Sequence, residues 1–377
     1  MRVRPALVWL HRYLGLSILA FLVLAGLTGS ILIFRARLDA LLNPKLFDVA
    51  THGSIMAPAR LADALAHRHP SWRITKVPLR LHRGRALAFE VTAAPATPPL
   101  AFSQVFVDPH TGRILGMRNN RPGWSRRHLI AAIFQLHQNL LLGTFGRWFM
   151  GVVAFGWVIS NLLGFYLTFP GLPPFWKRWS KMWRVARGTR LPRFCLDLHR
   201  AGGLWLFLGF LILAVTSVEM NFFDELFVPS VNLIFGAPDG ALDGAGAGMR
   251  TPPVQINFEK SLQVAGKRAK ISLPGWVPVF ASYDPQLGLY GVSFIPKGDN
   301  TYAWLGPVEY FVSANAKRVA GQDDPYQEGA RGILLRSLYP LHSGRIFGWP
   351  TRAFVFVLGL ATAVLSLTGL YVWYRRR

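Results

Sequence analysis

Four long apolar stretches constrain the fold of this chain more than any other feature. They cover residues 5–34, 146–169, 197–223 and 352–374. About 20 mostly apolar helical residues are enough to cross the roughly 30 Å hydrocarbon core of a bilayer. Only 16% of the 377 residues are charged and 51% are hydrophobic, a balance that is unusual in a soluble globular protein. We therefore expect a membrane protein with four transmembrane helices.

The positive charge of the chain predicts its orientation. There are 42 Lys and Arg residues against 18 Asp and Glu residues, an excess that would suggest nucleic-acid binding in a soluble protein. Here the short connection at residues 170–196, between the second and third apolar stretches, holds seven Lys and Arg residues and no Asp or Glu, and the C-terminus is Arg375, Arg376 and Arg377. Short cytoplasmic loops of membrane proteins are rich in Lys and Arg. We expect residues 170–196 and both termini to lie in the cytoplasm of a bacterial inner membrane, with no nucleic-acid partner.

Two longer regions, residues 35–127 and 224–327, would then lie in the periplasm. Both contain short segments rich in β-branched and aromatic residues between turn residues, such as FEVTAA and YGVSFIPKG, which predict strands. Residues 128–145 and 328–351 precede the second and fourth stretches, and we expect them to be interfacial. The predicted fold class is an α+β membrane protein in which four transmembrane helices carry two periplasmic α+β modules.

The two halves of the chain repeat the same motifs in the same order. Each half has a His-Arg pair in its first apolar stretch and a Leu-His pair ahead of its second, followed by an arginine ten residues after that histidine. These residues are His11-Arg12, Leu136-His137 and Arg147 in the first half, and His199-Arg200, Leu341-His342 and Arg352 in the second. The repetition predicts an internal duplication of a helix, module and helix unit.

The expected topology sorts the four repeated histidines by depth. His11 and His199 fall near the cytoplasmic face, whereas His137 and His342 fall near the periplasmic face. Two imidazoles from facing helices can hold a haem iron without any covalent attachment. The single cysteine, Cys195, excludes a c-type haem attachment or a cysteine-ligated iron–sulfur cluster within this chain. We therefore predict two haem b groups, one held by each pair of histidines, and no other metal.

Charged residues near the histidines are the remaining candidates for the site. Haem propionates require cationic partners, and a guanidinium group can bind a carboxylate through two hydrogen bonds. The candidate propionate partners are Arg12, Arg200, Arg147 and Arg352. An acidic residue at membrane depth is a functional candidate by default. The candidates for a substrate or proton role, at the end of the third stretch, are Glu219, Asp224 and Glu225.

The sequence resembles a known family over essentially its whole length. The turn segment VFVDPHTGRILG at residues 105–116, the two Leu-His motifs and the two His-Arg motifs are similar to those of the PepSY-associated transmembrane proteins, which are linked to iron uptake. Within that family the chain looks most like the inner-membrane siderophore reductases. The resemblance implies that Fe(III) in a siderophore of the hydroxamate type is reduced in the periplasm, because oxygen ligands hold Fe(II) less tightly. It also implies that the four repeated histidines bind haem.

Other functions fit parts of the same pattern. The chain could be a non-redox, membrane-anchored PepSY module that regulates or chaperones secreted peptidases, or a carrier for iron or its chelate. The sequence contains no Walker A, HExxH or GxSxG motif, so common hydrolase and nucleotide chemistries have no support. We expect an oxidoreductase that takes electrons from a quinol or from a cytoplasmic reductase.

Overall fold

A computed structural model describes residues 3–51, 53–236, 256–300, 303–314 and 318–375. The chain forms two compact units. The helical unit comprises Met1–Arg35, Ala132–Ser230 and Ser337–Arg377, and the sheet unit comprises Ala36–Ala131 and Val231–Arg336. Arg376 and Arg377, part of the expected basic C-terminus, lie outside the described residues, as do residues 237–255, 301–302 and 315–317 of the expected second module.

The helical unit contains three helices that are long and apolar enough to cross a bilayer. They are α1 (Val3–Leu32), α6 (Gly143–Leu167) and α13 (Trp349–Tyr374). The third expected span consists instead of α8 (Leu191–Trp205) and α9 (Phe207–Asn221), which are bent by 71° at Leu206. The described residues thus contain three candidate spans, or four if α8 and α9 are counted as one.

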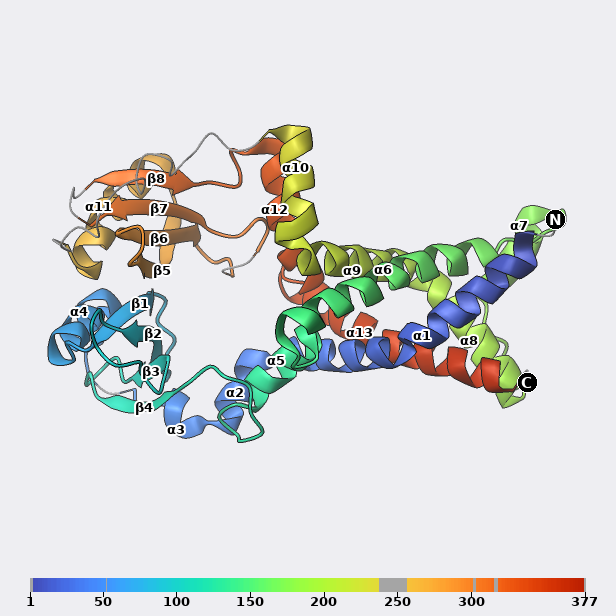
Figure 1. The fold of residues 1–377 in the computed structure, drawn as a ribbon, viewed down its shortest axis with the longest axis horizontal. Helices are drawn as coiled ribbons and strands as arrows, with labels where there is room; N and C mark the ends of the chain where they lie inside the picture. The colour runs from blue at the N-terminus through green and yellow to red at the C-terminus, as the bar shows by residue number, and fades with distance from the viewer. Residues whose placement is uncertain (1–2, 52, 237–255, 301–302, 315–317, 376–377) are drawn as a thin grey trace. The chain divides into compact units, whose positions relative to one another are not determined.

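Close helix packing holds this bundle together. Helix α1 packs against α13 and α6, and α6 packs against α9 (Figure 1). At the crossing of α1 and α13, a Cβ atom added to Gly26 would lie 2.5 Å from the carbonyl oxygen of Gly359. The Ser30 hydroxyl donates across the same crossing to the carbonyl of Phe356 at 3.0 Å. Small residues therefore let the two backbones touch, as is common between membrane helices.

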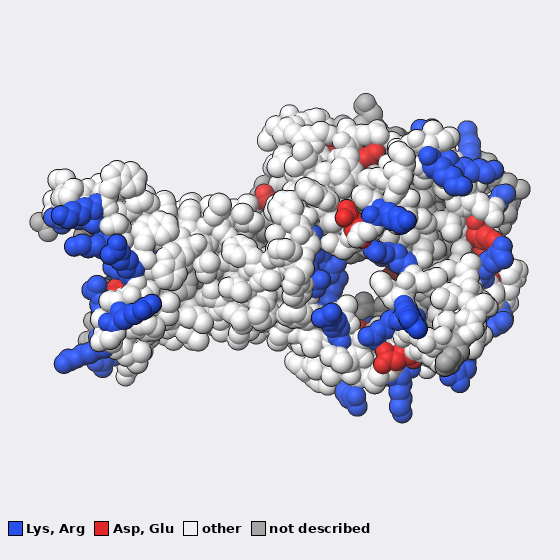
Figure 2. Space-filling view, turned by 180° about the vertical axis from the view of Figure 1, so that it is seen from behind, with Lys and Arg blue, Asp and Glu red and all other residues white. Residues whose placement is uncertain are grey.

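Charge is distributed over the helical unit as a bilayer would require. Figure 2 shows Lys and Arg gathered at the end that carries α7 (Phe175–Trp179), whereas the middle of the bundle on this face shows no charged residues. Both ends of the chain lie at that same end of the bundle (Figure 1). Large apolar side chains such as Leu27, Phe155 and Val357 are exposed along the helices. An exposed apolar surface of this kind is suited to contact with lipid.

The sheet unit is built on one antiparallel sheet of eight strands in the order β4-β3-β2-β1-β5-β6-β7-β8. The first expected module supplies β1 (Trp72–Pro78), β2 (Leu87–Ala93), β3 (Gln104–Val107) and β4 (Ile114–Arg118). The second supplies β5 (Trp276–Asp284), β6 (Leu289–Pro296), β7 (Val308–Ser313) and β8 (Val319–Asp323). Strands β1 and β5 pair antiparallel, with Val77 opposite Ala281. The two regions therefore form one continuous sheet within a single unit.

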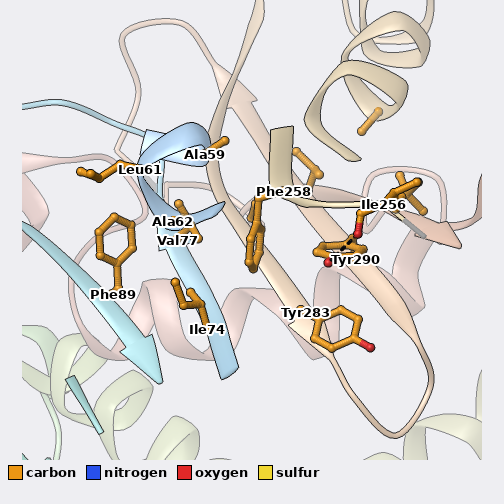
Figure 3. Close-up of a cluster of buried hydrophobic side chains, with 14 of the residues drawn as sticks. Ala59, Leu61, Ala62, Ile74, Val77, Phe89, Ile256, Phe258, Tyr283 and Tyr290 are labelled. Carbon is orange, nitrogen blue, oxygen red and sulfur yellow. Dashed lines mark hydrogen bonds between the residues drawn. The ribbon is translucent and has the colours of Figure 1, made fainter. Parts of the chain in front are cut away.

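One hydrophobic core serves both halves of this sheet. It includes side chains from α4 (Pro58–Arg68) and from α11 (Phe258–Ser272), together with alternate residues of the strands. Figure 3 shows Phe258 lying between Ala62 of the first half and Tyr290 of the second. The Tyr290 hydroxyl donates to the Ile256 carbonyl at 3.0 Å. Both helices thus cover the same face of the sheet.

Shorter helices complete the described fold. They are α2 (Arg35–Leu42), α3 (Pro44–Phe47), α5 (Leu129–Asn139), α10 (Val228–Phe235), α12 (Gly329–His342), a 3-10 helix at Ser180–Trp183 and a π-helix at Phe223–Phe227. Helices α5 and α12 carry the histidines of the two Leu-His motifs, His137 and His342, at or near their last residues.

Candidate functional site

The structure arranges the four repeated histidines as two pairs inside the helical unit. The ring centroids of His11 on α1 and His199 on α8 lie 6.3 Å apart. Those of His137 on α5 and His342 on α12 lie 6.1 Å apart. A metal-bound imidazole nitrogen lies about 2 Å from the metal, so two rings that bind one iron from opposite sides have centres about 6 Å apart. The spacing of each pair suits one iron between its rings.

Hydrogen bonds at Nδ1 orient the rings. His199 Nδ1 donates to the Leu365 carbonyl at 2.8 Å, and His137 Nδ1 donates to the Ala25 carbonyl at 3.1 Å. A carbonyl oxygen can only accept, so Nδ1 carries the proton in both rings. The lone pair is then on Nε2, which is the nitrogen left for a metal.

Hydroxyl groups also approach Nδ1 of the other two rings. Ser160 Oγ lies 3.3 Å from Nδ1 of His11, and Thr216 Oγ1 lies 3.1 Å from Nδ1 of His342. All four histidines are therefore held on the same ring atom by oxygen atoms of neighbouring helices.

Glycines make room for three of the rings. A Cβ atom added to Gly29 would lie 3.0 Å from Cε1 of His137, one on Gly164 would lie 3.1 Å from Cε1 of His11, and one on Gly369 would lie 3.0 Å from Cε1 of His199. Such close approach is possible because glycine has no side chain. These glycines were not predicted from the sequence. A signal was present, since Gly164 and Gly369 both stand two residues before a tyrosine near the end of an apolar stretch.

A chamber adjoins each pair. The α8 chamber, lined by His11 and His199 among others, has a volume of about 420 Å³. The α12 chamber, lined by His137 and His342 among others, has a volume of about 290 Å³. Ligand pockets in proteins commonly measure about 300–1,000 Å³ and have mostly apolar walls. Both chambers fit that description.

Three of the four predicted arginines line the chambers. Arg12 and Arg200 line the α8 chamber, and Arg352 lines the α12 chamber, where it also donates to the Ile33 carbonyl. The fourth, Arg147, lines neither chamber. It forms an ion pair with Glu225, one of the predicted acidic candidates, and donates to the Asn221 carbonyl.

Two further arginines, which the sequence did not suggest, line the α12 chamber. Arg35 donates to the Tyr339 hydroxyl at 3.4 Å, and the Arg345 guanidinium lies 5.7 Å from the centre of the Tyr339 ring. No local sequence pattern links these two arginines, because they lie near opposite ends of the chain. Among the described lining residues, neither chamber contains an aspartate or glutamate. Both are therefore suited to the negatively charged end of a ligand.

The acidic candidates lie away from the chambers. Glu219 is partly buried on α9, and Asp224 and Glu225 lie in the π-helix that follows. The hydrogen bond from Arg147 holds the pKa of Glu225 below its ordinary value. Asp197, which was not predicted from the sequence, is only 1% exposed and accepts hydrogen bonds from Arg200 at 2.9 Å and Arg193 at 3.0 Å. It fixes one of the two arginines of the α8 chamber.

A bundle of apolar helices with partly buried histidine pairs, on the same chain as an eight-stranded sheet, is typical of a membrane protein of the α+β class. The chain belongs to the PepSY-associated TM region family, which matches residues 8–376. No curated protein matches the chain.

Proposed function

We propose that this chain is a di-haem oxidoreductase of the bacterial inner membrane that reduces ferric siderophores in the periplasm and releases Fe(II). Within the family it would be of the ferrioxamine reductase (FoxB) type. The observation that carries the proposal is the presence of two histidine pairs, with ring centroids 6.3 and 6.1 Å apart, each beside its own chamber. Haem iron, when bound, supplies a one-electron couple between Fe(III) and Fe(II).

Four spans and an internal duplication belong to this proposal. Helices α8 and α9 would together form one broken span, with the basic α7 end in the cytoplasm. The contacts of the histidines support the duplication. Thr28 lies 3.1 Å from Nδ1 of His137, and Thr216 lies 3.1 Å from Nδ1 of His342. Each threonine stands seventeen residues after the histidine of its own His-Arg motif.

The residues of the chain have distinct roles in this arrangement. The Nδ1 hydrogen bonds fix the histidine rings and leave Nε2 available to iron. Arg12 and Arg200 would bind propionate groups in the α8 chamber, and Asp197 positions Arg200. Arg35, Arg345 and Arg352 would do the same in the α12 chamber. A quinol or a cytoplasmic reductase would supply electrons at the α8 chamber, and a siderophore, of the hydroxamate type, would receive them beyond the α12 chamber.

An absorption spectrum of the purified full chain, expressed with adequate haem, tests the proposal most directly. We expect a Soret band and two haems per chain. His11→Ala or His199→Ala should remove one haem, and His137→Ala or His342→Ala should remove the other. His69→Ala is a matched control, because its ring stacks on Trp72 in the sheet unit. A colourless wild-type protein would overturn the haem assignment. So would an Ala variant of one of the four repeated histidines that still binds both haems.

Anaerobic mixing of the dithionite-reduced protein with a ferric hydroxamate tests the substrate. Reoxidation of the haem with formation of Fe(II) is the expected result. A coloured protein that stays reduced would exclude this substrate class. Uptake of iron into vesicles without any reductant would instead indicate a carrier.

A further inference from the structure

The two chambers share part of their lining. Leu22 of α1, Trp157 of α6 and Thr362 of α13 line both the α8 chamber and the α12 chamber. Along α6, Val153 lines the α12 chamber four residues before Trp157, and Ser160 lies beside His11 three residues after it. Because a helix rises about 1.5 Å per residue, Trp157 lies about one turn from Val153 and from Ser160 along the helix axis. The three shared residues form the wall between the chambers.

Trp157 is the only aromatic residue of this wall within the described part of the chain. It packs against a buried cluster formed by Phe210, Leu213 and Leu358. The rings of Trp157 and Phe210 lie 6.2 Å apart, and Phe210, which is 4% exposed, lines the α8 chamber. Two adjoining aromatic rings therefore lead from the α8 chamber to the wall. Leu22 and Thr362 contribute no delocalised electrons there.

We propose that Trp157 is the electronic bridge between the chambers, an inference that rests on the proposed function. Electron tunnelling weakens exponentially with the width of the gap it must cross, and a delocalised π system between donor and acceptor lowers the barrier more than an aliphatic side chain does. Haem held by His11 and His199 would supply one electron on passing from Fe(II) to Fe(III), and haem held by His137 and His342 would take it up on passing from Fe(III) to Fe(II). No proton moves, and the indole ends the step unchanged.

Electron flux across liposomes that contain the full chain tests this role. A reduced viologen is trapped inside and ferric citrate is added outside, so that only bilayer-spanning protein connects the two. We expect Trp157→Leu to lower the flux at least about ten-fold, which corresponds to about 1.4 kcal/mol in the barrier. Trp157→Phe should retain most of the flux, because it keeps an aromatic ring. Haem content and the absorption spectrum are measured on every preparation.

Trp148→Leu is the matched control. Trp148 lies on the same helix, is 45% exposed, packs against Phe222 and lines neither chamber. Its replacement should leave the flux unchanged.

The outcomes separate the two proposals. A Trp157→Leu protein that keeps both haems and conducts at the wild-type rate would overturn the bridge, as would a Trp157→Phe protein that keeps both haems and is as slow as Trp157→Leu. Loss of haem from both variants would also overturn it, since Trp157 would then only shape the chambers. A wild-type protein without haem would instead refute the proposed function.

Discussion

At the scale of single residues, Asp108 organises the turn between β3 and β4. Its carboxylate accepts hydrogen bonds from the His110 backbone and the Thr111 hydroxyl, both at 2.8 Å. Gly112, with a φ of +70°, closes the turn by donating to the Asp108 carbonyl at 2.9 Å. Burial alone would raise the pKa of Asp108, but these hydrogen bonds outweigh it and hold the pKa below its ordinary value. The VDPHTG motif is therefore a structural turn.

Replacing Asp108 should destabilise the fold in a pH-dependent way. Asp108→Ala should lower the free energy of unfolding by about 1–3 kcal/mol at pH 7. Because the folded-state pKa is depressed, this contribution is present above the unfolded pKa of about 4 and is lost as the pH falls through the folded-state pKa. Thermal unfolding in detergent between pH 7 and pH 3 measures the difference. Glu90→Ala, at an exposed position on β2, is the control, and an Asp108→Ala deficit that persists undiminished at pH 3 would contradict the explanation.

The glycine beside His199 offers a residue-scale test of the chambers. A Cβ atom on Gly369 would lie 3.0 Å from Cε1 of His199, so Gly369→Ala should displace that ring. We expect haem affinity to fall about 10–100-fold in the α8 chamber and to stay unchanged in the α12 chamber. Haem titration of the apoprotein measures both sites. Gly266→Ala is the control, because Gly266 lies on α11, lines neither chamber, and its Cβ would meet nothing within 4 Å; equal losses in both variants would exclude the steric explanation.

At the scale of helices and strands, the crossing of α1 and α13 depends on two glycines. Gly26→Ala would place a methyl group against the backbone of Gly359, where no flexible side chain can move away. We expect the free energy of unfolding to fall by about 1–3 kcal/mol. Gly15→Ala on the same helix meets nothing within 4 Å and should stabilise the protein slightly, because glycine costs about 0.5–1 kcal/mol within a helix. Thermal unfolding in detergent would refute this account if both variants behaved alike.

The sequence predicted helices better than it predicted their directions. The expected stretches 5–34, 146–169 and 352–374 coincide closely with α1, α6 and α13. The stretch 197–223 instead contains the 71° bend between α8 and α9. Hydropathy reports that residues are apolar, and it carries no information about the direction of the backbone. Strand segments were also recognisable, because local residue patterns mark them. The pairing of β1 with β5 was not, because it joins residues about 200 positions apart and has no local signal.

The candidate site was predictable only where the chain repeats itself. The histidines could be paired from the sequence because each has a counterpart in the other half. Arg35 and Arg345 could not be assigned to a site, because they reach the α12 chamber through tertiary packing. Trp157 could not be assigned to the site from the sequence either, because a tryptophan in an apolar helix usually faces lipid or a core.

At the scale of the whole molecule, the sheet unit is the clearest case in which two distant segments depend on each other. The Asp63 carboxylate on α4 accepts hydrogen bonds from the backbone N–H groups of Phe258 at 3.1 Å and Glu259 at 3.2 Å, at the start of α11. A side chain of the first half therefore caps a helix of the second. The pairing of β1 with β5 also covers two strand edges that separate modules would expose.

These contacts predict that the two halves of the sheet unfold together. Asp63→Ala removes two hydrogen-bond acceptors from the first turn of α11, leaves the N-cap Asn257 in place, and should cost about 0.5–2 kcal/mol. Because Phe258 belongs to the core that both halves share, we expect faster amide hydrogen exchange in β2 and β3 as well as in β6 and β7. Arg60→Ala removes only an exposed ion pair with Glu259, which should contribute about 0–1 kcal/mol and serves as the control. Faster exchange confined to α11 and the strands β5 to β8 would show that the halves unfold independently. In a cooperative sheet the loss of stability would also reach β2 and β3 through the pairing of β1 with β5.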